Sequence, residues 1–143
     1  MKVVSQLALA ILFLVGCSRP AEPDGLVLST LNDDIRAEKT ISLQAYTTFN
    51  WDRVYIFQPY IPESVIREDT GTDIKFPHSD SEGHCLLLFT RQGQAPKAIE
   101  VQRIRADFSR LYRKEGYSRD EAIFNVIVDK SPIQNWWHLE RKQ

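Results

Sequence analysis

The chain has 143 residues, of which 26% are charged and 43% hydrophobic, and its formal net charge is −1. This near balance excludes a strongly basic protein that binds nucleic acid through bulk charge. The length suits one domain with a hydrophobic core, and the two cysteines are Cys17 and Cys85.

A short apolar run follows Met1-Lys2 at the start of the chain. Residues 3–15 are apolar except for Ser5 and Gln6, and this is too short for a helix that spans a bilayer, which needs about 20 residues. A charged start followed by a short apolar core is typical of a secretory signal peptide. We therefore expect residues 1–16 to be a signal peptide.

The end of this run, Leu14-Val15-Gly16-Cys17, resembles the lipobox of bacterial lipoproteins. The resemblance implies cleavage after Gly16 and attachment of lipid, including palmitate, to Cys17. Two or more acyl chains hold a protein stably on a membrane without spanning it. An ordinary signal peptide with an incidental cysteine is the alternative.

The expected location is therefore the bacterial cell envelope, with the protein lipid-anchored. The lipid would sit in the outer membrane facing the periplasm if the organism is Gram-negative, or on the outer face of the cell membrane if it is Gram-positive. Residues 17–25 contain two prolines and a glycine and no large apolar side chain, so we expect a lipidated tether there. The folded domain should comprise residues 26–143.

The first elements of this domain follow from the spacing of apolar residues. Leu28, Leu31 and Ile35 recur at helical spacing, which predicts an amphipathic helix within residues 26–38. Apolar and polar residues alternate over residues 40–49, which predicts a strand.

A strand that is apolar on both faces is predicted next, in residues 53–60 of the sequence RVYIFQPY. Alternate side chains of a strand point to opposite faces, so such a strand should be covered on both sides. Pro62 suits the first turn of a short helix and Gly71 suits its end. Residues 71–83 are polar and rich in turn-forming residues, which predicts a loop.

The remaining elements are predicted by the same patterns. Two strands within residues 84–104 should be joined by a turn at Gln92-Gly93-Gln94, and a short helix is expected in the segment that ends at Gly116. Two further strands are predicted, at residues 122–130 and 133–141. A capping box at Ser118 and Glu121 makes a helix the alternative for residues 122–130. The sum is a single α+β domain: a mostly antiparallel sheet of about five strands with two or three short helices.

One segment, residues 49–65, combines aromatic residues, an aspartate and prolines. It resembles a pattern of Trp-Asp followed by Tyr-x-Phe-x-Pro-Tyr in a family of small, largely uncharacterised bacterial lipoproteins and secreted proteins. The resemblance implies topology and location and no known activity, and Gln58 replaces the glycine expected in the pattern. The matching residues are Trp51, Asp52, Tyr55, Phe57, Pro59 and Tyr60.

Four of these residues, Trp51, Asp52, Tyr55 and Tyr60, are candidate binding residues. Aromatic faces stack on sugars and other planar groups, and a carboxylate can orient hydroxyl groups. The alternative is that the aromatic side chains form the core of one strand face and that Asp52 caps a turn.

A second candidate cluster lies at the end of the predicted loop. His78, Asp80, Glu82, His84 and Cys85 include the ligand types of zinc. Their spacing matches no standard zinc pattern, so we favour a solvated loop beside a buried Cys85. We predict no metal and no cofactor.

Two further features bear on partners. Residues 103–119 carry six basic residues against two acidic ones, which favours either a solvated face or contact with anionic lipid headgroups or envelope polymer. Trp136 and Trp137 must point to opposite faces if they lie on a strand. One should be in the core and the other is available to a partner.

The sequence contains no catalytic motif, so we predict no catalytic residue. The favoured function is a non-catalytic binding module of the cell envelope, which contacts the membrane through the lipid at Cys17 and binds an envelope protein or a cell-wall glycan but no nucleic acid. The alternative is an envelope hydrolase, or another enzyme of unknown substrate, that uses Asp52 or His84.

Overall fold

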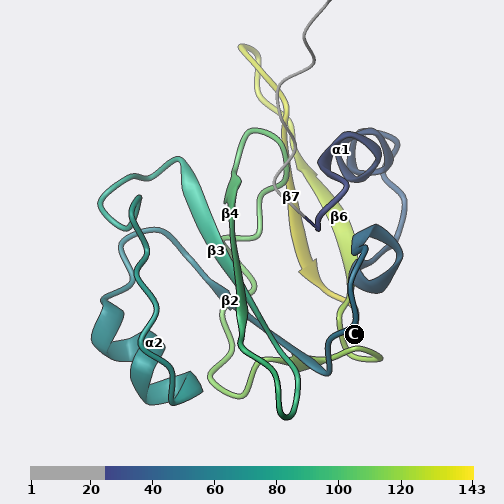
Figure 1. The fold of residues 1–143 in the computed structure, drawn as a ribbon. Coiled ribbons are helices and arrows are strands. Elements are labelled where there is room, and N and C mark those ends of the chain that lie inside the picture. Colours follow the sequence, from purple (N-terminus) through teal and green to yellow (C-terminus); the bar gives the residue numbers. More distant parts are fainter. Residues whose placement is uncertain (1–24) are drawn as a thin grey trace, which may run out of the picture.

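The structure, a computed structural model, describes residues 25–143. The predicted signal peptide, Cys17 and all of the predicted tether except Gly25 lie outside the described residues. Within residues 25–143 no helix is both long enough and apolar enough to cross a bilayer. Two antiparallel sheets pack with helices at their sides (Figure 1).

The three-stranded sheet has the strand order β1-β6-β7 and lies beside the first helix. The first element of the described chain is this helix, α1, whose apolar side chains Leu28, Leu31 and Ile35 are buried. The elements are α1 (Leu28–Arg36), β1 (Ile41–Ser42), the 3-10 helix η1 (Leu43–Tyr46), β6 (Ile123–Asp129) and β7 (Trp136–Arg141).

The four-stranded sheet has the strand order β4-β3-β2-β5, and all its neighbours are antiparallel. Figure 1 shows α2 beyond its outer face. The elements are β2 (Arg53–Phe57), α2 (Glu63–Thr70), β3 (His84–Thr90), β4 (Lys97–Gln102) and β5 (Tyr117–Ser118).

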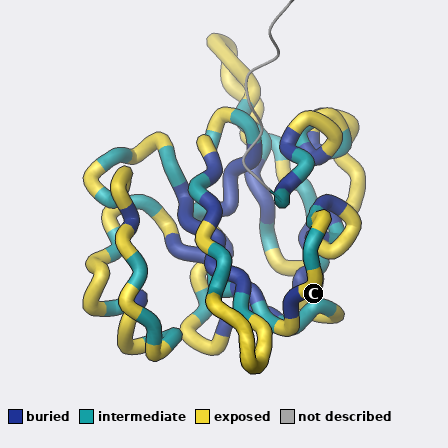
Figure 2. The backbone as a smooth tube through the Cα atoms, viewed as in Figure 1, coloured by how far each residue is buried: buried dark blue, intermediate teal, exposed yellow. Residues whose placement is uncertain are grey.

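Both faces of the four-stranded sheet are buried, as the apolar sequence of β2 predicts. Val54 and Ile56 point into the larger core between the two sheets, together with α1. Phe57 points the other way into a smaller core that includes Ile66 of α2, and Tyr55 packs against it. Figure 2 shows the buried segments along the centre of the molecule and the exposed ones in the loops.

The mixture of helices and mostly antiparallel strands is confirmed, whereas the prediction of one sheet of about five strands is imprecise. The strands form two sheets, of three and four strands, and residues 25–143 contain two α-helices. The second sheet arises because the last two long strands pair with each other and with β1 rather than with β2–β4.

The predicted strand at residues 40–49 is also wrong beyond its first residues. Only Ile41 and Ser42 pair with β6. The chain then turns through η1, in which Leu43 and Tyr46 are buried. The spacing of three between Leu43 and Tyr46 suits a 3-10 helix. Tyr46 is buried and Ala45 is exposed, so the alternation in the sequence does not continue as a strand.

The predicted helix before Gly116 does not form, and turns occupy residues 103–116 instead. Phe108 and Leu111 are buried, so their helical spacing reflects core contacts of a folded loop. The Asp107 carboxylate accepts a hydrogen bond of 3.0 Å from the Ser109 N–H, and side-chain bonds of this kind compete with helix formation.

The capping box at Ser118 and Glu121 forms, but no helix follows it. The Ser118 N–H donates to the Glu121 carboxylate at 2.9 Å, and the Glu121 N–H donates to the Ser118 hydroxyl at 3.3 Å. The box closes a single turn before β6 begins at Ile123. The strand predicted for residues 122–130 is therefore confirmed, and the rival helix is wrong.

Gly116 holds the chain in a left-handed conformation, with φ of 63°, where it crosses β2. A Cβ added there would lie 2.7 Å from the Val54 carbonyl oxygen and 2.9 Å from the Tyr55 ring. We therefore expect Gly116→Ala to lower the free energy of unfolding by about 3 kcal/mol, through backbone strain and overpacking together.

Gly71 is the matched control, because its φ is 69° but nothing lies within 4 Å of an added Cβ. Gly71→Ala should cost only about 1 kcal/mol. Urea unfolding of the two variants measures both losses, and equal losses would contradict the close approach at Gly116.

Candidate functional site

Two polar side chains are fully buried within residues 25–143: those of Asp107 and His138, each in a residue that is 1% exposed. They belong to a junction where the segment after β4 meets β7. The Leu139 N–H donates a hydrogen bond of 3.0 Å to the Asp107 carbonyl, which links the loop to the edge of the three-stranded sheet. Buried polar groups destabilise a fold unless they are hydrogen-bonded, so the stability of this junction depends on the hydrogen-bond partners of these two side chains.

The Asp107 carboxylate accepts four hydrogen bonds. Arg103 donates from Nε to Oδ1 and from Nη2 to Oδ2, each at 3.0 Å. The Ser109 N–H adds a bond of 3.0 Å to Oδ1, and the Trp136 indole Nε1 adds one of 2.6 Å to Oδ2. A carboxylate offers about four acceptor positions, so Asp107 is saturated and acts as a fixed anchor for Arg103 and Trp136.

The same contacts explain the protonation states at the junction. Burial raises the pKa of Asp107, but the hydrogen bonds from Arg103, Ser109 and Trp136 outweigh it and the pKa lies below its ordinary value. The hydrogen bond to Asp107 in turn raises the pKa of Arg103. The guanidinium of Arg103 also donates to the Glu82 carbonyl at 3.0 Å and lies 5.7 Å from the centre of the Trp136 ring.

A second charged group surrounds His138. Arg110 donates from Nη2 to the Asp129 carboxylate at 3.0 Å and from Nη1 to the Glu140 carboxylate at 3.3 Å, and Nη1 also lies 2.6 Å from His138 Nε2. His138 Nδ1 lies 3.3 Å from the Asp129 carboxylate. Arg110 thereby clamps the β6–β7 hairpin against the loop that carries Asp107.

Two cavities meet at Arg110. The first cavity, of about 770 Å³, lies between the start of β3, the end of β4 and the end of the β6–β7 hairpin next to its turn. Its wall combines one indole with acidic, basic and amide side chains and the imidazole of His84. The residues that line it are Glu82, Gly83, His84, Gln102, Arg103, Ile104, Asp107, Arg110, Asp129 and Trp136.

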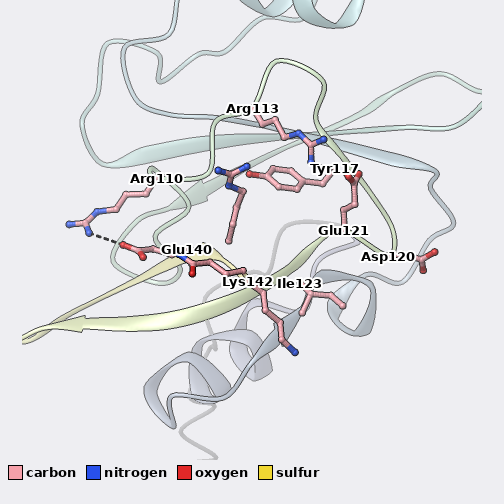
Figure 3. A pocket seen from close by; sticks show the side chains of 10 residues that line it. Arg110, Arg113, Tyr117, Asp120, Glu121, Ile123, Glu140 and Lys142 are labelled. Carbon is pink, nitrogen blue, oxygen red and sulfur yellow. Dashed lines mark hydrogen bonds and ion pairs between the residues drawn. The ribbon is translucent and has the colours of Figure 1, made fainter.

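The second cavity, of about 730 Å³, lies between the turn before β6 and the end of β7. Figure 3 shows Arg113, Tyr117 and Glu121 grouped on one side of it, and the Arg110–Glu140 pair on another. A hydrogen bond from the Ser118 backbone and the contact with Arg113 lower the pKa of Glu121 to about 2. On this wall, Arg110 is therefore paired with Glu140 and Arg113 with Glu121.

The predicted binding residues do not come together at either cavity. Trp51 is 1% exposed in the larger core, where its indole donates to the Thr47 hydroxyl at 2.9 Å. The Asp52 carboxylate accepts a bond of 3.1 Å from the Gln92 N–H of the β3–β4 turn. Tyr55 packs against the smaller core, whereas Tyr60 is 62% exposed with φ of 63°.

The potential zinc ligands of residues 78–85 make other contacts. His78 pairs with Glu100, and the rings of His78 and His84 stack at 4.3 Å. Cys85 is fully buried, as predicted, and burial raises the pKa of its thiol to about 12. Residues 25–143 contain no group of three or more His, Cys, Asp or Glu side chains placed to hold a metal.

The positive charge predicted for residues 103–119 is largely offset by carboxylates from other elements. Arg113 pairs with Glu121 at 3.1 Å and Lys114 with Glu68 at 2.8 Å, in addition to the pairs of Arg110 with Asp129 and Glu140. The segment is therefore a network of ion pairs that ties the loop to α2, β6 and β7.

Trp136 and Trp137 point to opposite faces of β7, as predicted. Trp137 packs against the larger core, and the Arg36 guanidinium lies 4.0 Å from the centre of its ring. Trp136 lines the first cavity together with Asp107.

Sequence reasoning did not single out Asp107 or His138 as site residues. The usable signal was a polar residue within a buried apolar pattern, in Ala106-Asp107-Phe108 and Trp137-His138-Leu139.

In comparisons with known proteins, no family model, no curated protein and no solved structure matches this chain. Its function must therefore be argued from the site itself.

Removing the charge of Asp107 should destabilise the domain. We expect Asp107→Asn to lower the free energy of unfolding by about 3 kcal/mol near neutral pH, because Arg103 loses its buried partner. The folded-state pKa of Asp107 is depressed. Its contribution is therefore present above the unfolded pKa of about 3.9 and is lost as the pH falls through the folded value.

The difference between the two proteins should accordingly shrink below about pH 4. Urea unfolding at several pH values measures it, and Asp80→Asn in an exposed loop is the control. A difference that stays constant down to about pH 2.5 would contradict this role of the carboxylate.

Proposed function

We propose that the protein is a lipid-anchored cell-envelope protein that binds its ligand without catalysis, and that the first cavity is the binding surface. The saturated carboxylate of Asp107 carries this proposal. Because all its acceptor positions are occupied, it positions the Arg103 guanidinium and the Trp136 indole and has no free position to take a proton from a substrate.

The lining of the first cavity favours a glycan as the ligand. Sugar rings offer C–H groups that pack on an indole, and hydroxyl groups that hydrogen-bond to carboxylate, amide and guanidinium side chains. Trp136 supplies the indole, and Gln102, Arg103 and Asp129 supply polar groups around it. A preformed wall with a few fixed polar groups is the usual architecture of a ligand site.

The hydrolase alternative receives less support from the residues assigned to it. The Asp52 carboxylate is engaged by the β3–β4 turn and lines neither of the two large cavities. His84 does line the first cavity, beside Glu82. The binding experiment below therefore includes an assay for glycan cleavage.

Lipid attachment is tested by growing the producing bacteria with an alkyne-tagged fatty acid. The chain should carry the label, and Cys17→Ser should abolish it. Cys85→Ser is the matched control and should retain the label, because the Cys85 side chain is buried. Labelling that survives in Cys17→Ser would contradict the proposed anchor.

Glycan binding is tested by sedimenting the full chain with purified cell-wall polymer. We expect Trp136→Ala to weaken binding at least tenfold, which corresponds to about 1.4 kcal/mol. Tyr60→Ala is the control, because Tyr60 is exposed away from the cavity wall but belongs to the residues predicted from sequence. Thermal unfolding verifies that both variants are folded.

Two results would contradict the proposal. Loss of binding in Tyr60→Ala with retention in Trp136→Ala would place the binding surface on the segment after β2. Release of soluble sugar fragments by the unmodified chain, abolished by His84→Ala, would make the protein a hydrolase.

A further inference from the structure

Two small cavities lie side by side at the end of β3 that is far from the first cavity. Their volumes are about 220 and 250 Å³, and Phe49 and Asn50 line both. Three basic residues also line them: Arg91 and Lys97 in one, and Arg119 in the other. Among the described residues, 25–143, no aspartate or glutamate lines either cavity; the carboxylate of Asp52, beside them in the chain, is occupied by the β3–β4 turn.

One hydrogen-bond donor of Arg119 has no partner beside these two cavities. Its Nε is buried and has no hydrogen-bond partner, and its guanidinium lies 5.8 Å from the centre of the Trp51 ring. A buried donor without a partner costs free energy. The cavity that Arg119 faces is otherwise lined by the hydroxyl and amide side chains of Gln44, Thr47, Thr48 and Asn50, which suits an anion with several oxygen acceptors.

The chain enters the domain at this same surface. Thr48 donates its N–H to the Gly25 carbonyl at 3.0 Å. A Cβ added to Gly25 would lie 2.7 Å from the Phe49 ring and 2.9 Å from the Lys97 ammonium. Gly25 lies eight positions after Cys17 in the chain, and eight residue steps reach at most about 29 Å.

We propose that this basic patch, formed by Arg91, Lys97 and Arg119, docks on the membrane by binding the phosphates of anionic lipid headgroups. The proposal rests on the anchor at Cys17, which would hold this side of the domain near the bilayer. The basic side chains of the lining complement an anionic surface, and an arginine binds phosphate through several N–H donors at once.

Docking in this way would orient the glycan-binding surface. In the β3–β4 ladder, Phe89 pairs with Lys97 at the patch, and His84 pairs with Gln102 at the first cavity. Five residue steps separate these pairs, which is about 17 Å along a strand, and Figure 1 shows the two strands side by side. With the patch on the lipid, the first cavity faces away from the membrane.

Flotation of the full chain with vesicles tests the patch separately from the anchor. The chain carries Cys17→Ser, so acylation contributes nothing and any binding through residues 1–24 is common to all variants. We compare vesicles of phosphatidylcholine with vesicles that contain about one third phosphatidylglycerol. Binding should be at least tenfold stronger to the anionic vesicles, and about 0.5 M salt should remove the difference.

The variant Arg91→Gln, Lys97→Gln, Arg119→Gln should lose this increment. A charge-matched control replaces Arg67, Lys75 and Lys130, which lie outside the patch, by glutamine and should keep it. Equal losses in the two triple variants would overturn the proposal, because net charge alone would then explain binding. Full competition by millimolar inorganic phosphate would also overturn it, since the cavity would then be a site for a small soluble anion.

These outcomes are distinguishable from failure of the proposed anchor. The fatty-acid label reports on Cys17 alone, and the flotation increment reports on the patch alone. Acylation without the increment would leave the anchor in place and remove the docking surface.

Discussion

The organisation of this protein depends on one buried carboxylate. Asp107 joins the segment after β4 to β7, through its side chain to Trp136 and through its carbonyl to the Leu139 N–H. An ionised group in this position is tolerated only because four donors surround it. Arg103 provides two of these donors. The two sheets are therefore connected by a polar junction at their edge as well as by the apolar core between them.

That junction explains why the cavity wall is both charged and ordered. Long side chains such as arginine lose rotamer entropy when they are fixed, and an exposed ion pair returns little free energy. Arg103 and Arg110 are nevertheless held by several contacts each. Fixing them in advance lowers the entropy that a ligand would otherwise have to overcome. From this preorganisation we infer that the first cavity binds a ligand. Docking of the basic patch, as proposed, would orient that cavity away from the membrane.

Local sequence patterns predicted the helices and strands whose apolar faces pack into a hydrophobic core. The alternation of Val54 and Ile56 with Tyr55 and Phe57 required cover on both faces of β2, and the two cores provide it. Gly71 ends α2 with φ of 69°, as a helix-stop glycine should. Leu28, Leu31 and Ile35 mark the buried side of α1.

The site and the second sheet depend on contacts between distant residues, which local patterns do not contain. Phe108 and Leu111 have helical spacing, but Asp107 draws the chain into turns through bonds to Ser109 and Trp136. Trp51 resembled a binding residue because aromatic residues serve both cores and ligand sites. Only its burial, at 1% exposure, separates the two roles.

The most direct test of this account is a pH titration of the three tryptophan indole N–H signals by NMR. The hydrogen bond from Trp136 to Asp107 predicts that the Trp136 signal alone shifts as the carboxylate is protonated, with a midpoint below the ordinary value of 3.8. The signals of Trp51, bound to Thr47, and of Trp137 should stay constant while the protein remains folded. A Trp136 signal that does not move, or that moves together with the other two, would contradict the account.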